Sequence, residues 1–174
     1  MKPGNFDCKR KMDYPATDFE SVFQTMLAAK IEFIIIGGIA ANLLGSPRYT
    51  LDVDIIYLRT TENMQRIVEW LTPFHPYLRG APPGLPFQLD LRTLKMGLNF
   101  TFLTDLGSID ILGEVPGGGS YKELLPFTEV RSAYGLDLCC VNLEKLIELK
   151  RASGRTKDFE GIAELEIIRQ ENSR

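Results

Sequence analysis

Residues 36–55 decide the fold, and they read Ile-Gly-Gly-Ile-Ala-Ala-Asn-Leu-Leu-Gly-Ser-Pro-Arg-Tyr-Thr-Leu-Asp-Val-Asp-Ile. This stretch places Gly37 and Gly38 directly after one apolar strand, and Asp52 and Asp54 on the next. Successive side chains of a strand alternate between its faces, so both aspartates point the same way, with about 6.6 Å between their Cα atoms. Their carboxylates can therefore converge on one cation.

The glycine pair is predicted to open a helix over residues 37–44. The first backbone N–H groups of a helix have no partner within it, and together with the helix dipole they attract an anion. A side chain at Gly37 or Gly38 would block the close approach of the backbone to phosphate oxygens. The sequence thus predicts a phosphate cradle beside a metal clamp.

The combination resembles the signature of the nucleotidyltransferase superfamily of the polymerase beta type. That signature is Gly-Gly or Gly-Ser after an apolar residue, a gap of variable length, and Asp-x-Asp or Asp-x-Glu between apolar residues. Here thirteen residues separate Gly38 from Asp52, at the upper end of the usual gap. Gly-Gly alone is usually a turn, and Asp-x-Asp alone is usually a solvated strand end. The resemblance implies an α/β (α+β) fold, a mixed β-sheet with helices packed against it and a C-terminal helix pair.

A third carboxylate lies in residues 108–112, Ser-Ile-Asp-Ile-Leu, where Asp110 interrupts an apolar strand. A charge in such a position needs a partner. The resemblance implies that a neighbouring strand supplies a third metal ligand, and Asp110 is the matching residue. The alternative is an aspartate of an edge strand that faces solvent. Because carboxylate oxygens suit hard cations, the cofactor implied is Mg²⁺ or Mn²⁺.

Further residues resemble one minimal, single-domain branch of the superfamily. This branch contains predicted nucleotidyltransferases and the toxins of abortive-infection toxin–antitoxin systems. In it, Pro-Arg-x-Thr-x-Asp-x-Asp is followed by a later Lys and an Arg-x-Lys-Asp near a helix pair. The matching residues here are Arg48, Thr50, Lys150, Arg155 and Asp158.

The resemblance also implies a role for each of these residues. Asp52 and Asp54 would hold the metal of the nucleotide, and Asp110, or an ion it holds, would activate the acceptor hydroxyl. Lys150 or Arg48 could contact the triphosphate, because both a point charge and a planar fork suit phosphate oxygens. Asp158 could orient Lys150 or Arg155. The alternative for the basic cluster is a solvated helix connection in which Asp158 caps the last helix.

The function implied is transfer of a nucleoside monophosphate from a nucleoside triphosphate, ATP among them, to a hydroxyl, with release of pyrophosphate. The acceptor stays open between a small molecule, a protein and tRNA. Two alternatives stay open as well. One is the toxin role, the same chemistry controlled by an antitoxin protein. The other is a nucleotide-binding or interaction protein that performs no transfer.

The composition is that of an ordinary globular protein. The 174 residues are 44% apolar and 25% charged with a net charge of −3, which argues against a broadly basic nucleic-acid-binding surface. His75 is the only histidine, and Cys8, Cys139 and Cys140 have no metal-ligand spacing, so histidine triads and zinc sites are disfavoured. Neither a membrane span nor a signal peptide is expected, and a cytoplasmic location follows by default.

One domain is expected over residues 17–174, preceded by a loosely ordered arm over residues 1–16. Helices are expected over residues 18–29, 37–44, 62–72 and, as the C-terminal pair, about 142–170. Strands are expected over residues 31–36, 49–58, 98–103, 108–112, 127–131 and 136–141. The Pro-rich residues 73–86 are expected to contain no regular element and to form a binding flap or a simple excursion. Residues 113–119 lack a Walker lysine, which favours a flexible connection.

Overall fold

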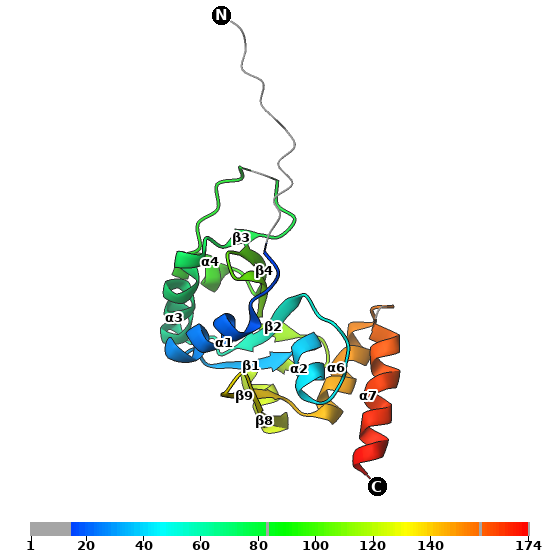
Figure 1. Ribbon diagram of the computed structural model, residues 1–174. Coiled ribbons are helices and arrows are strands. Elements are labelled where there is room, and N and C mark those ends of the chain that lie inside the picture. The colour runs from blue at the N-terminus through cyan, green and yellow to red at the C-terminus, as the bar shows by residue number, and fades with distance from the viewer. Residues whose placement is uncertain (1–14, 83, 157, 174) are drawn as a thin grey trace, which may run out of the picture.

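A mixed seven-stranded sheet forms the centre of the molecule, with the strand order β3-β4-β5-β2-β1-β9-β8 (Figure 1). The computed structural model describes residues 15–82, 84–156 and 158–173. Within the sheet, β2 is parallel to β5 and β1 is parallel to β9, while the other neighbours are antiparallel. The strands are β1 Phe33–Ile36, β2 Asp52–Tyr57, β3 Tyr77–Leu78, β4 Asn99–Thr104, β5 Gly107–Leu112, β8 Thr128–Ala133 and β9 Leu136–Val141.

Helices cover both faces of this sheet, which confirms the predicted α/β class. Several begin at polar caps: the side chain of Thr60 accepts from the backbone N–H of Asn63, and that of Asn142 accepts from the backbone N–H of Lys145. Gly154 ends α6 in the left-handed conformation. The helices are α1 Phe19–Ala28, α2 Gly37–Leu43, α3 Thr61–Leu71, α4 Leu91–Met96, α5 Tyr121–Leu124, α6 Leu143–Ser153 and α7 Asp158–Asn172.

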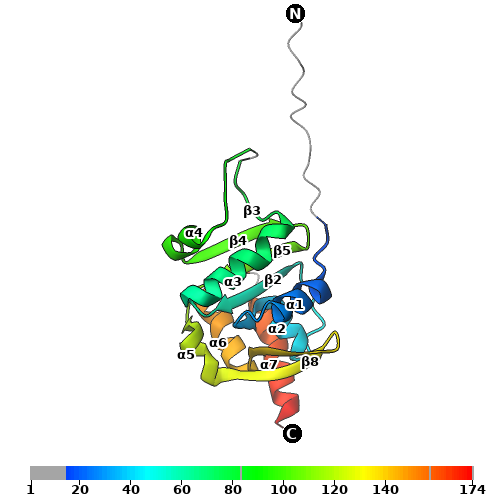
Figure 2. The ribbon, with the colours of Figure 1, turned by 90° about the vertical axis from the view of Figure 1, so that its left-hand side faces the viewer.

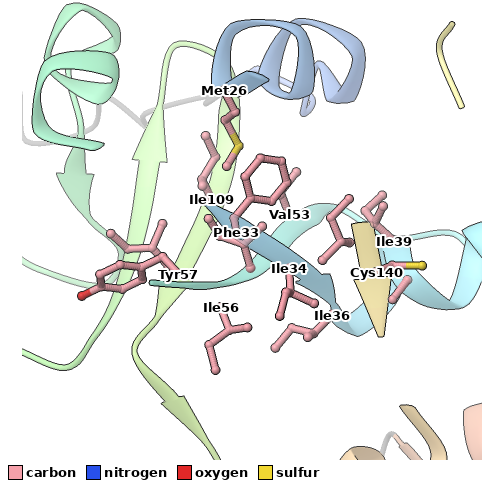
Figure 3. Packing of buried hydrophobic residues seen from close by; sticks show 14 of the residues in the cluster. Met26, Phe33, Ile34, Ile36, Ile39, Val53, Ile56, Tyr57, Ile109 and Cys140 are labelled. Atoms are coloured by element: carbon pink, nitrogen blue, oxygen red, sulfur yellow. The ribbon is translucent and has the colours of Figure 1, made fainter. Parts of the chain in front are cut away.

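One face of the sheet packs against α1 and α3, which Figure 2 shows in front of the strands. Phe23 of α1 stacks on Phe33 of β1, with ring centroids 6.4 Å apart. Val53 and Ile109 point to the same side of the sheet, toward α1 (Figure 3). All four side chains are buried, so hydrophobic burial fixes which way β1, β2 and β5 face.

The opposite face carries α2 and α6, and α7 packs beside α6 (Figure 1). Ile36 of β1 is paired with Asp54 of β2, and Asp54 with Asp110 of β5, so these three side chains share this second face. The alternation that buries Val53 therefore turns both neighbouring aspartates toward α2 and α6.

The prediction that residues 73–86 contain no regular element was wrong at Pro73 and Phe74, which belong to a short 3-10 helix (Thr72–Phe74), and at Tyr77 and Leu78. Tyr77 and Leu78 form β3 at the edge of the sheet, opposite Leu103 and Phe102 of β4. Prolines flank β3 in the sequence, and an edge strand tolerates them because one side of its backbone needs no partner. Part of the described chain between Arg79 and α4 projects from the body of the molecule (Figure 1).

Helices α4 and α5, the 3-10 helix Leu125–Phe127 and a hairpin in the glycine-rich segment were not predicted either. Helix α4 begins at Asp90, whose side chain accepts from the backbone N–H of Thr93, but its six residues are too few to show helical periodicity. The glycine-rich segment forms a small hairpin of β6 (Glu114–Val115) and β7 (Gly119–Ser120) instead of an open connection. A Cβ atom on Gly117 would lie 2.6 Å from the Cβ of Ala152, so this hairpin packs closely on α6.

The predicted N-terminal arm falls mainly on residues 1–14, which lie outside the described residues. Thr17, where the domain is expected to begin, is tied to the sheet. Its hydroxyl accepts from the backbone N–H of Ser108 at 3.1 Å, and the next N–H, of Asp18, donates to Leu106 O at 2.9 Å. Among the described residues, no helix has both the length and the apolar character that crossing a membrane requires.

Candidate active site

Three carboxylates converge on the face of the sheet that α6 covers. Asp52 and Asp54 project from β2 and Asp110 from β5, and parallel pairing places Asp54 directly opposite Asp110. One carboxylate oxygen of each lies within 4.8 Å of the others. Residues far apart in the sequence thus meet because β2 and β5 are neighbours.

The cluster holds negative charge that the protein only partly neutralises. Burial, followed by the charges of Asp52 and Asp110, raises the pKa of Asp54 to about 7, against the effect of a hydrogen bond from the Gly38 N–H. Burial also raises the pKa of Asp110, although the positive charge of Arg79 opposes this. In addition, Asp110 Oδ1 is buried and has no hydrogen-bond partner among the described residues. A cation among these oxygens would lower the pKa of Asp54 and of Asp110, and it would give Asp110 Oδ1 a partner.

These residues fit a metal ion. Three carboxylates offer oxygen ligands, the kind that hard divalent cations prefer. The unpaired Oδ1 of Asp110 is an acceptor with a free coordination position, and an uncompensated buried oxygen of this kind is costly unless something binds it. The cluster therefore could bind a metal ion through Asp52, Asp54 and Asp110.

The glycine pair brings the start of α2 against this cluster. Gly37 has a φ of +65°, which favours glycine, and a Cβ atom there would lie 2.1 Å from Asp54 Oδ2. A Cβ atom on Gly38 would lie 2.4 Å from the hydroxyl oxygen of Thr50. The missing side chains make room for Asp54 and Thr50.

Arg48 lies in the loop between α2 and β2 and reaches across to α7. Its guanidinium pairs with Glu160 at 2.7 Å and with Glu164 at 3.1 Å, and Glu164 also accepts from the hydroxyl of Ser46. Thr50 lies closer to the carboxylates, with its Oγ1 3.4 Å from Asp52 Oδ1. Arg48 therefore fastens α7 to the loop that leads into β2.

The C-terminal helix pair supplies a second cluster. Lys150 Nζ lies 3.3 Å from Asp158 Oδ1, and Ser153 Oγ donates to Asp158 Oδ2 at 2.7 Å. The Lys150 and Asp158 side chains are only about 15% exposed. Arg155 makes no ion pair within 4 Å of another described side chain, yet its charge lowers the pKa of Asp54, Asp110 and Asp158 alike. The basic residues of α6 and the α6–α7 turn thus lie beside the acidic cluster.

Arg79 is a site residue that the sequence analysis missed. Its guanidinium donates to Asp110 Oδ2 at 2.5 Å and lies 3.4 Å from Asp52 Oδ2. Arg79 directly follows β3, and its backbone N–H donates to Thr101 O at 2.9 Å. The only local signal was a basic residue inside the Pro-rich segment, where no strand was expected.

All ten residues that the sequence singled out line one cavity of about 550 Å³. They are Gly37, Gly38, Arg48, Thr50, Asp52, Asp54, Asp110, Lys150, Arg155 and Asp158. Arg79 lines the cavity as well, and an apolar wall comes from Leu112, Val115, Leu146 and Leu149. A volume of this size suits a ligand as large as a nucleotide.

Comparisons with known proteins agree with this architecture. No protein-family model matches the chain, and no curated protein sequence matches it. One similar solved structure is a protein from Thermotoga maritima described as a "putative nucleotidyltransferase" (TM1012). Its identity is 14% and its TM-score 0.54, over 88% of this chain and 90% of that one.

A second similar structure is the lincosamide antibiotic adenylyltransferase LnuA in its lincomycin-bound form. It has 16% identity and a TM-score of 0.60, over 88% of this chain and 98% of that one. The chain therefore has the fold of nucleotidyltransferases, as the sequence predicted.

Proposed function

We propose that this protein is a metal-dependent nucleotidyltransferase. It transfers a nucleoside monophosphate from a nucleoside triphosphate to a hydroxyl of an acceptor and releases pyrophosphate. The observation that carries the proposal is the convergence of Asp52, Asp54 and Asp110 inside a cavity with basic residues, on a fold shared with nucleotidyltransferases.

In this proposal, Asp52, Asp54 and Asp110 hold Mg²⁺ or Mn²⁺. Such ions neutralise charge on phosphate oxygens and help to generate a nucleophilic oxygen. The chain itself orients the substrates. Lys150, held by Asp158, and Arg155 provide positive charge for the triphosphate on the α6 side of the carboxylates.

Asp110 lies on the β4 side of the cluster, because β5 is between β2 and β4 in the sheet. It is paired across the sheet with Thr101, which lines the same cavity. We place the acceptor hydroxyl on this side, near Asp110. The Asp110 carboxylate would take up the proton of this hydroxyl as the hydroxyl oxygen attacks the nucleotide phosphate and pyrophosphate leaves. Arg48 supports the site indirectly by fastening α7, and Gly37 and Gly38 let α2 approach the carboxylates.

The acceptor we favour is a small molecule that bears a hydroxyl. LnuA, whose structure is similar, is an adenylyltransferase of a small antibiotic. The net charge of −3 also gives tRNA no broad basic surface to bind. A protein acceptor is an alternative that the acceptor assay below tests, and control by an antitoxin is a further alternative.

Nucleotide binding is tested by thermal unfolding of the purified protein. We expect Mn²⁺ together with one or more of ATP, GTP, CTP and UTP to raise the Tm, because a ligand that binds only the folded state stabilises it. The variant Asp52→Asn/Asp54→Asn should lose this rise. The control Asp137→Asn removes an exposed carboxylate on β9 and should keep it. A folded wild-type protein that no nucleotide stabilises would contradict the proposal.

Transfer is tested with nucleoside triphosphates labelled at the α-phosphate. The label is followed into three separate acceptor pools: small hydroxylated metabolites and antibiotics, total tRNA, and protein. Label in the first pool supports the favoured acceptor, and label in either of the others replaces it. Nucleotide binding without label in any pool would support the non-catalytic alternative.

A further inference from the structure

Arg79 occupies the position where a cation is expected among the carboxylates. Its two terminal nitrogens approach Asp110 Oδ2 at 2.5 Å and Asp52 Oδ2 at 3.4 Å. Both oxygens belong to residues that the proposed function makes metal ligands. Among the described residues Asp110 Oδ1 has no partner, so a divalent cation could reach that oxygen, but two cations on one carboxylate repel each other and each weakens the binding of the other.

The sheet fixes where Arg79 lies. In the antiparallel pairing of β3 with β4, Leu78 is opposite Phe102, and the next N–H, of Arg79, donates to Thr101 O. Thr101 is in turn opposite Asp110. Arg79 therefore continues the row that contains Asp110 across the sheet, and a long side chain from this position reaches the carboxylates.

The other basic residues of the cavity are engaged elsewhere or lie farther from the carboxylates. Arg48 pairs with glutamates of α7, and Lys150 with Asp158. Arg155 acts on the cluster only through its charge, since no ion pair within 4 Å joins it to a described carboxylate. Among the described residues, Arg79 is the basic residue that directly contacts the cluster.

We propose that Arg79 is a positioning residue of this site: it holds Asp52 and Asp110 together as an internal counter-cation, and a divalent cation displaces it from them. This inference rests on the proposed function, because it takes the three carboxylates as the metal ligands. Without the Arg79 charge, the carboxylates should keep their negative charge, and no guanidinium should compete with a metal ion for them. Metal should then bind more tightly, although the metal-free protein becomes less stable.

The test measures binding of Mn²⁺ alone, without nucleotide, by calorimetry and by electron paramagnetic resonance of free Mn²⁺. Wild type is compared with Arg79→Gln, Arg79→Lys and Arg48→Gln. We expect Arg79→Gln to bind Mn²⁺ about tenfold more tightly than wild type. Arg79→Lys, which keeps the charge, should stay within about threefold of wild type. Arg48→Gln loses the same charge in the same cavity without touching the carboxylates, and should also change little.

Metal-free stability supplies a second readout. The Tm without metal should fall in Arg79→Gln and be restored in Arg79→Lys, and saturating Mn²⁺ should raise the Tm more in Arg79→Gln than in wild type. If Arg79→Gln does not fold without metal, folding that depends on Mn²⁺ supports the inference. In that case Mn²⁺ affinity is compared between wild type and Arg79→Lys. We expect Arg79→Lys to bind Mn²⁺ with an affinity between that of wild type and that of Arg79→Gln refolded with metal.

Three results would overturn the inference. Equal or weaker Mn²⁺ binding in Arg79→Gln would show that Arg79 does not compete with the metal. Equal gains in Arg79→Gln and Arg48→Gln would reduce the effect to general charge. Absence of Mn²⁺ binding in every folded variant would remove the metal site itself, and with it the proposed function. If the Arg79 variants bind Mn²⁺ as tightly as wild type does, only this inference fails and the proposed function stands.

Discussion

Asp54 on β2 lies directly opposite Asp110 on β5, and Gly37 at the start of α2 lies so close to Asp54 that a Cβ atom there would be 2.1 Å from Asp54 Oδ2. This relationship joins three separate parts of the chain at one carboxylate. Burial and the charges of Asp52 and Asp110 raise the pKa of Asp54, and the Gly38 backbone N–H opposes this rise. Its ionisation is therefore a sensitive measure of the whole site.

The stability of the metal-free protein should fall as the pH rises from about 4 to about 7. The pKa of Asp54 is about 7 in the folded protein and near 3.8 in the unfolded chain, so the folded state binds an additional proton between these values. The stabilisation is complete below the lower value and is lost as the pH passes the upper one. Its size should be a few kcal/mol, measured by urea unfolding across this range.

Asp54→Asn is the control for this pH dependence. It should flatten most of the curve and raise the Tm of the metal-free protein at pH 8, because it removes a buried charge that has like charges beside it. The same variant should lose stabilisation by Mn²⁺. A curve that keeps its full slope in Asp54→Asn would assign the titration to another group.

Gly37→Ala should disrupt the site as well as the fold. The new methyl group would meet Asp54 Oδ2, and the backbone φ of +65° adds strain. We expect a loss of stability of about 3 kcal/mol or more, and no stabilisation by Mn²⁺. Gly135→Ala is the matched control: its φ is +70°, but a Cβ atom there meets nothing within 4 Å, so only about 1 kcal/mol should be lost. Equal losses in the two variants would rule out the contact with Asp54 as the cause.

Asp158→Asn should weaken both stability and nucleotide binding. Burial alone would raise the pKa of Asp158, but the Ser153 hydrogen bond and the Lys150 charge hold it below its usual range. Replacement leaves Lys150 without its partner in a poorly exposed position, at a cost of about 2 kcal/mol.

The control for Asp158→Asn is Glu148→Gln, on the same helix α6. Glu148 pairs with Lys145 but is 58% exposed, so its loss should change stability by less than about 0.5 kcal/mol. Chemical denaturation measures both variants. An Asp158→Asn protein as stable as wild type, with unchanged nucleotide affinity, would contradict the role assigned to the pair.

Asn63→Ala should destabilise the fold without touching the site. The Asn63 side chain is fully buried and makes hydrogen bonds to the backbone N–H and C=O of Glu32 and to the C=O of Leu58. These bonds join α3 to the start of β1 and the end of β2. Leaving buried backbone groups unpaired should cost about 2–4 kcal/mol in urea unfolding. A loss under about 0.5 kcal/mol would show that water replaces the amide.

Most of the fold and most of the candidate site were predictable from local pattern. Strand alternation placed Asp52 and Asp54 on one face, and the isoleucines beside Asp110 marked its strand. Thr60 and Asn142, the N-caps of α3 and α6, are residue types that favour the start of a helix. Helix α4 and strand β3 were not predictable in this way, because elements of six and two residues are too short to show a period.

By itself, therefore, the sequence determined which residues alternate toward one face, where the main helices begin, and that glycines precede the first aspartate strand. Only the tertiary structure decided that β3 brings Arg79 to the carboxylates, that Gly37 lies against Asp54, and that Arg48 pairs with glutamates of α7. The physical reason is the range of the forces involved. Side-chain period and capping act within a few residues, whereas strand order and ion pairing depend on which distant segments share a buried core.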